Sequence, residues 1–197
     1  MTDPRHDVVA GPENGVRLRR AAEEDVDFAV DLFTDAEIEP YPAAVRPRDR
    51  EGLLAEIRRS QELPEECGRF VIEVEDGGRW SAAGVMGFDV ANRRSRIANL
   101  GGLAIHGTFR GRRLADRAAR ILQRYLLLEL GFHRLQLECY GFNERAIRHA
   151  ERAGFIREGV RRRAYWRHDQ WVDGVLFALL REDLPEETAA PSRESRR

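Results

Sequence analysis

The chain has 197 residues, 42% of them hydrophobic and 34% charged, which favours a single domain whose core needs neither disulfides nor a metal. The formal net charge of −1 excludes a global electrostatic field for nucleic acid or a membrane surface. The N-terminus lacks a signal-peptide pattern, and no apolar run approaches the roughly 20 residues of a membrane span. We therefore expect a cytoplasmic protein with no membrane or nucleic-acid partner.

The thiols and imidazoles give no sign of a metal site. Cys67 and Cys139 are far apart in the sequence, and we expect two reduced, buried thiols. The histidines show no ligand spacing with one another or with cysteine, so we expect surface or loop positions for them. Those in the predicted domain are His106, His133, His149 and His168.

Composition divides the chain into a domain and two tails. Residues 1–15 and 185–197 are rich in proline, glycine or charge, and both segments are predicted to be disordered. The domain spans residues 16–184. It opens with an alternating strand at residues 16–19 and a helix with apolar spacing at residues 25–33. A second helix carries Leu53, Leu54, Ile57 and Gln61 on one side and ends before Pro64.

Three strands are predicted next, over residues 69–75, 82–90 and 96–105. The last contains Gly101-Gly102, and paired glycines inside a strand indicate a bulge or a close approach to the backbone.

The second half begins with a strongly amphipathic helix. One apolar stripe runs from Leu114 to Tyr125 at helical spacing, and Gly131 is expected to end the helix. A strand at residues 135–140 follows, and then a helix capped by Asn143. Strands at residues 155–166 and 171–180 form a closing hairpin.

The turn before the amphipathic helix has the composition of a phosphate site. The first N–H groups of a helix lack partners, and the helix dipole favours an anion there. Gly111 lets the backbone approach a ligand, and the arginines of Arg110-Gly111-Arg112-Arg113 add permanent positive charge. A solvated arginine face on an ordinary helix start is the alternative.

Two blocks of this sequence resemble the GNAT acetyltransferase superfamily. The first is Leu103-Ala104-Ile105 through Arg110-Gly111-Arg112-Arg113-Leu114-Ala115, which is similar to its motif A. The second runs from Asn143-Glu144-Arg145-Ala146 through Ala153-Gly154-Phe155. Arg163-Ala164-Tyr165-Trp166 and Trp171-Val172-Asp173 look like the Rim-type branch, which acetylates ribosomal-protein N-termini and related amines.

The resemblance implies an α/β (α+β) fold and a cofactor. The family fold is a mixed, mostly antiparallel sheet of about six to seven strands, splayed in the middle and flanked by about four helices. Acetyl-CoA would lie in the gap, with its pantetheine against Leu103, Ala104, Ile105 and Asn143. Its pyrophosphate would meet the turn and helix start formed by Arg110, Gly111, Arg112, Arg113, Leu114 and Ala115.

Two positions depart from the family pattern. Arg113 stands where motif A usually has its middle glycine, and arginine would be strained there if the position requires a positive φ. Ala150 stands where many members have a tyrosine that protonates the leaving thiolate, which leaves the general acid unassigned.

Glu138 is the candidate general base, because it matches a family glutamate and faces away from the apolar Leu135, Leu137 and Cys139. Pairing with an arginine is the alternative. Tyr140 lies on the same face as a candidate donor to the thiolate, with packing as its alternative. Tyr165 and Trp166 are candidates to line the amine pocket.

We therefore predict an acetyl-CoA-dependent N-acetyltransferase that acts on a primary amine, either a peptide N-terminus or a small molecule, in a ternary complex. It would be a monomer or homodimer and would need no metal. The alternatives are a non-catalytic acyl-CoA-binding module and an RNA-associated protein that uses the arginines at 157–163. Alternation along a strand would split those arginines between two faces, which favours a solvated strand edge.

Overall fold

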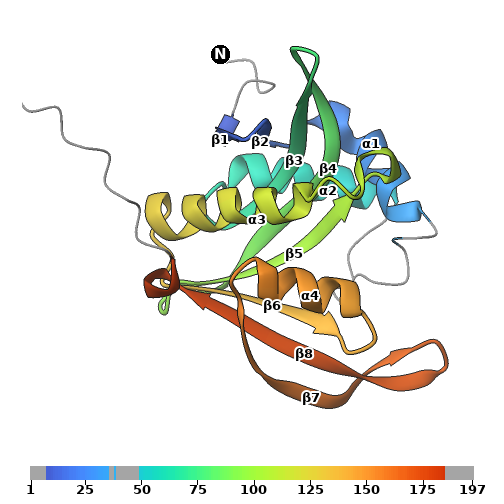
Figure 1. Ribbon diagram of the computed structural model, residues 1–197, viewed down its shortest axis with the longest axis vertical. Coiled ribbons are helices and arrows are strands. Elements are labelled where there is room, and N and C mark those ends of the chain that lie inside the picture. The colour runs from blue at the N-terminus through green and yellow to red at the C-terminus, as the bar shows by residue number, and fades with distance from the viewer. Residues whose placement is uncertain (1–7, 36–37, 39–48, 185–197) are drawn as a thin grey trace, which may run out of the picture.

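The computed structural model describes residues 8–35, 38 and 49–184, which form eight strands and four α-helices (Figure 1). The strands are β1 (Val8–Glu13), β2 (Val16–Arg20), β3 (Cys67–Asp76), β4 (Arg79–Asn92), β5 (Ile97–Ile105), β6 (Arg134–Tyr140), β7 (Ile156–Arg167) and β8 (Gln170–Leu180). The helices are α1 (Val26–Thr34), α2 (Arg50–Glu62), α3 (Leu114–Arg124) and α4 (Glu144–Arg152). A π-helical turn, Tyr125–Glu129, extends α3.

All eight strands belong to one sheet in the order β1-β2-β3-β4-β5-β6-β8-β7. Among these pairs, only β5 and β6 are parallel. The predicted mixed, mostly antiparallel fold with four helices is confirmed. The eight strands exceed the predicted six to seven, because β1, which lies within residues 1–15, adds to the sheet by pairing with β2. Residues 1–7 and 185–197 lie outside the described residues.

The helices cover the sheet in two pairs (Figure 1). The apolar stripe of α3 is buried at Leu114, Ala118, Ile121 and Leu122, and it packs with β-strand side chains such as Phe70 and Ile72. Ala150 of α4 joins the same cluster. On the opposite face, α1 and α2 pack around Val71. Alternation along β3 therefore supplies side chains to both cores.

The sheet opens between β5 and β6. These strands pair over three residues only, Ile97↔Arg134, Ala98↔Leu135 and Asn99↔Gln136. Beyond this point they diverge, as Figure 1 shows, while each keeps its outer neighbour, β4 or β8. The predicted splay in the middle of the sheet is confirmed.

A bulge in β5 accompanies the divergence. The register against β4 shifts between Val85↔Ala104 and Gly87↔Gly101, and Gly102 has a φ of +66°. A residue with a side chain is disfavoured at this φ, so glycine permits the bulge that the sequence indicated.

Candidate functional site

The turn before α3 is held in left-handed conformations at two positions. Gly111 has a φ of +81°, and a Cβ added there would meet nothing within 4 Å. Arg113, the N-cap residue of α3, has a φ of +54° and gives the helix no side-chain cap. The departure from the glycine of motif A thus falls on a position where arginine is strained.

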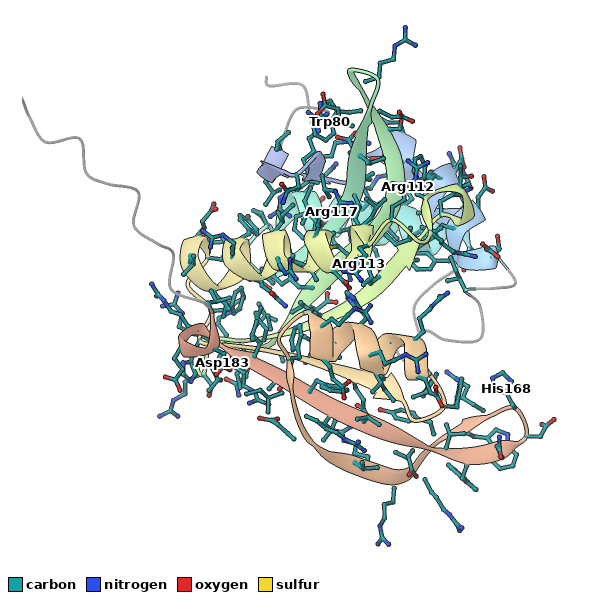
Figure 2. All side chains as sticks on the ribbon, viewed as in Figure 1. Trp80, Arg112, Arg113, Arg117, His168 and Asp183 are labelled. Carbon is teal, nitrogen blue, oxygen red and sulfur yellow. The ribbon has the colours of Figure 1, made fainter. Side chains whose placement is uncertain are left out.

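The arginines around this turn have different roles. Arg110 faces the protein, since its Nε donates to the Ile105 carbonyl (3.1 Å) and its terminal nitrogen donates to Asp35 (2.8 Å). Arg117 donates to the carbonyls of Arg112 and Asn14, both at 2.7 Å, which fixes the turn against the β1–β2 loop. Arg112 and Arg113 are exposed beside the start of α3 (Figure 2). Their charges and the first amides of α3 therefore form one positive surface.

The gap between β5 and β6 leads to this surface. Leu103, Ala104 and Ile105 lie on β5 beyond its last pair with β6. Across the gap, Asn143 caps α4, and its Oδ1 accepts from the Ala146 N–H (3.0 Å) as the sequence predicted. The predicted cofactor-binding residues thus lie on β5 beyond its pairing with β6, in the turn and first residues of α3, and at the cap of α4, with the side chain of Arg110 bound to Ile105 and Asp35.

A buried carboxylate ties α3 to α4 beside this opening. Asp116, in the first turn of α3, contacts His149 Nδ1 (2.7 Å) and accepts from Arg152 Nε (3.0 Å). Burial lowers the pKa of His149, although its hydrogen bond to the Asp116 carboxylate opposes this shift. His149 was expected at a surface or loop position, but the packing of α4 against α3 half-buries it.

Glu138 lies in a recess made by a glycine on the neighbouring strand. A Cβ on Gly174 of β8 would come within 2.0 Å of Glu138 Oε1 and 2.9 Å of the Tyr165 ring. Glu138 Oε2 is 3.4 Å from Arg161 of β7, whereas Oε1 is buried and has no hydrogen-bond partner among the described residues. Burial and then a hydrogen bond with Glu138 raise the pKa of Tyr165. The sequence analysis missed Gly174, although a glycine inside a strand is itself a sign of close approach.

Tyr140 and Trp166 occupy different surroundings. Tyr140 is fully buried, and its hydroxyl accepts from Arg167 Nε (2.7 Å). Its ring packs edge-on against Tyr165, with centroids 5.3 Å apart. Trp166 alternates with Tyr165 along β7, so it faces the other side of the sheet and packs against the exposed Trp171. Tyr165 thus lies beside Glu138, but Trp166 does not.

The remaining candidates are accounted for by packing. Ala150, at the position of the family tyrosine, is buried in the main core. Cys67 and Cys139 are free and buried, as predicted, and burial raises the pKa of Cys139 to about 11. Within residues 8–35, 38 and 49–184 we find no cluster of three potential metal ligands. No described helix is long and apolar enough to span a membrane.

Comparison with known proteins agrees with this geometry. A family model described as Acetyltransferase (GNAT) domain matches residues 16–156. A stretch of 82 residues is 31% identical to the SPbeta prophage-derived uncharacterized N-acetyltransferase YokL of Bacillus subtilis (strain 168). That stretch covers 42% of this chain and 46% of YokL, so less than half of this curated relative is matched.

Two solved structures show the same fold. RimL, a ribosomal L7/L12 α-N-protein acetyltransferase, has a TM-score of 0.74 and 18% identity over 91% of this chain and 98% of its own, and it is also known in complex with coenzyme A. A variant of the spermidine N-acetyltransferase SpeG from Vibrio cholerae has a TM-score of 0.72 and 18% identity over 86% of this chain and 96% of its own. At these identities the likeness concerns the fold.

Proposed function

Because this chain belongs to the GNAT acetyltransferase family, we propose that it transfers an acetyl group from acetyl-CoA directly to a primary amine, as a Rim-type N-acetyltransferase. The observation that carries the proposal is the end of β5–β6 pairing at Asn99↔Gln136. Beyond it, β5 continues toward the start of α3, and β6 carries Glu138 two residues past the last pair. The start of α3 supplies amides and positive charge, and Glu138 supplies a carboxylate with an oxygen that no described residue hydrogen-bonds.

The residues present fit the cofactor. Gly111 leaves open space at its backbone, where a phosphate can approach, and Arg112 and Arg113 contribute charge beside the first amides of α3. The backbone of Leu103, Ala104 and Ile105 lies on the open side of β5, where the pantetheine arm would pair with it. When bound, acetyl-CoA supplies the thioester that the amine attacks.

The chemical step needs a proton acceptor and a donor. A peptide α-amine has an ordinary pKa of about 7.7–8.0, so a carboxylate such as Glu138 can take its proton, directly or through water. Tyr140 and Tyr165 are the phenols next to Glu138 and are our candidates to protonate the leaving thiolate. Tyr140 is held by Arg167, which fixes the position of its hydroxyl.

The test is release of free thiol from acetyl-CoA with a panel of amines that includes peptide N-termini, polyamines, aminoglycosides and amino acids. We expect turnover with at least one class and transfer of the acetyl group to the amine, detected by mass spectrometry. Thermal stabilisation by CoA without thiol release from any amine would instead identify a non-catalytic acyl-CoA-binding module, the alternative suggested by Ala150.

A further inference from the structure

Two arginines lie on the face of the sheet that carries Glu138, Arg161 next to Glu138 and Arg167 next to Tyr140. Arg161 and Arg167 both belong to β7 and point to the same face of the sheet as Glu138. Arg161 is aligned with Gly174, which in turn is aligned with Tyr140 of β6. Arg167 reaches the hydroxyl of Tyr140 and lies over its ring, 5.2 Å from the centroid.

Arg161 and Arg167 lie on one face of β7 although a bulge separates them. The register against β8 shifts between Arg161↔Gly174 and Tyr165↔Val172, so that three residues of β7 lie opposite one of β8. Arg163, inside this bulge, has a φ of +50°, and its N–H donates to Asp173 Oδ1 (2.7 Å). The bulge adds two residues to β7 relative to β8. Alternation on its two sides therefore stays in phase, and Arg161 and Arg167 share a face.

The charge of Arg167 is fixed but not neutralised. Its Nε is held by a neutral phenol and a terminal nitrogen by the carbonyl of Trp166 (3.2 Å), and the side chain is half-buried. No carboxylate in the described part of the chain pairs with it. Arg161 pairs with Glu138. Together with Arg167, this face therefore carries two guanidinium groups and the single carboxylate of that pair. A half-buried cation held in place without a counter-ion favours a ligand that brings one.

We propose that Arg167, together with Arg161, binds a carboxylate on the acceptor, and that the acceptor is a primary amine with an acidic group a few bonds away. This inference rests on the proposed acetyltransferase function. A peptide N-terminus with Asp or Glu at its second or third position has this chemistry, and so does a free amino acid. A polyamine does not, because its additional cations would meet the two guanidinium groups.

The first experiment compares matched acceptors. Peptides that differ only in Glu, Gln or Lys at the second position are assayed for kcat/KM, alongside free amino acids and spermidine. We expect the Glu peptide to exceed the Gln peptide by roughly tenfold, the worth of one charge-assisted hydrogen bond, and the Lys peptide to be poorest. The preference should shrink as salt is raised. A preference for free amino acids over peptides would show that the carboxylate belongs to a small-molecule acceptor rather than to a peptide.

The second experiment removes the arginine. Arg167→Gln should abolish the Glu-over-Gln preference mainly through KM, and Arg167→Lys should restore part of it. Arg157→Gln is the control, because Arg157 lies on the same strand opposite Phe177 and points to the other face. Binding of the same peptides to the CoA-saturated protein, measured by calorimetry, gives a readout that does not need turnover.

These results separate the two proposals. Turnover without acid preference, or a preference unchanged in Arg167→Gln, overturns the inference and leaves the acetyltransferase function standing. Acid-selective binding that depends on Arg167, without turnover of any amine, would support the inference and overturn the acetyltransferase function. Salt-sensitive binding of a random single-stranded RNA, with no selection among the peptides, would assign the arginines to RNA and would also overturn the inference.

Discussion

Two glutamates on the same sheet show how differently its two halves use charge. Glu73 of β3 is buried between two arginines, with Oε2 accepting from Arg17 Nε (2.6 Å) and Oε1 accepting from Arg19 Nε (2.8 Å). Glu138 of β6 has one oxygen 3.4 Å from Arg161 and the other without a partner among the described residues.

The network around Glu73 closes on itself. Arg19 also makes a two-pronged contact with Asp25, at 2.6 and 2.7 Å. Although burial lowers the pKa of Arg19, these hydrogen bonds raise it above its ordinary value. Charges that satisfy one another in this way hold β2, β3 and the start of α1 together. In the half formed by β6, β8 and β7, Glu138 instead has one oxygen that no described residue hydrogen-bonds. On our proposal, this difference separates a structural carboxylate from a catalytic one.

The largest expected effect comes from Glu138→Gln. If this carboxylate takes the proton of the amine, kcat should fall by about 10²- to 10⁴-fold while the CoA dissociation constant stays nearly unchanged. Steady-state kinetics from about pH 7 to 9, roughly one unit to either side of an α-amine pKa, measure the loss. Equal activity of the variant and the wild type across that range would reject the assignment.

We propose that the turn at the start of α3 binds CoA, and Gly111→Val tests this. A β-branched residue at a φ of +81° is strained, so the turn should change shape and CoA affinity should fall by about tenfold or more. Gly78→Val is a matched control, because Gly78 has a φ of +80° and equal open space, but lies in the β3–β4 turn. Calorimetric titration with CoA should separate the two variants, and equal losses would mean that strain alone is responsible.

Glu73→Gln should act on stability rather than on turnover. The change leaves two part-buried guanidinium groups without their shared carboxylate, and we expect a loss of about 1.5–3 kcal/mol in the free energy of unfolding. Denaturant titration measures this loss, and kcat should stay close to that of the wild type. A large drop in kcat in the intact fold would erase the distinction between the two glutamates.

A smaller effect is expected at Arg113. Arg113→Gly removes the backbone strain of a side chain at a positive φ, but it also increases the conformational entropy of the unfolded chain. The net gain in the free energy of unfolding should therefore be below about 1 kcal/mol. CoA affinity should fall, because a charge beside the phosphate site is removed. Arg163→Gly, at a φ of +50°, is the control and should leave CoA affinity unchanged.

The smallest effect concerns pH and the bridge between α3 and α4. The pKa of His149 is lowered in the folded protein, so the unfolded chain takes up the proton first and stability falls as pH drops through about 6.5. His149→Gln should lack this part of the slope, whereas His133→Gln, at an exposed position, should keep it. Melting temperatures measured from neutral to mildly acid pH compare the three proteins, and identical slopes would contradict the assignment.

Local patterns predicted the parts of this fold that depend on local physics. The stripe of α3, the cap at Asn143 and the bulge at Gly102 follow from periodicity, side-chain chemistry and the freedom of glycine. Strand β1 was missed because it depends on pairing with β2, which its composition does not reveal.

The candidate site shows the same division. Alternation indicated that Glu138 faces away from Leu137, and the structure agrees. The recess over Gly174 and the approach of Arg167 to Tyr140 depend on the register of three strands and on a bulge in β7. No spacing within one strand encodes such a relation, so these residues could be found only in the assembled sheet.

The three residue pairs that join β5 to β6 also have a mechanical consequence. Because so few pairs join the two halves of the sheet, we expect them to flex about Ile97–Asn99. Asp116 links α3 and α4 across this junction. A ligand that hydrogen-bonds along β5 would restrict this motion. Amide exchange in residues 100–105 should therefore slow when CoA is added, while the already paired β3 changes little.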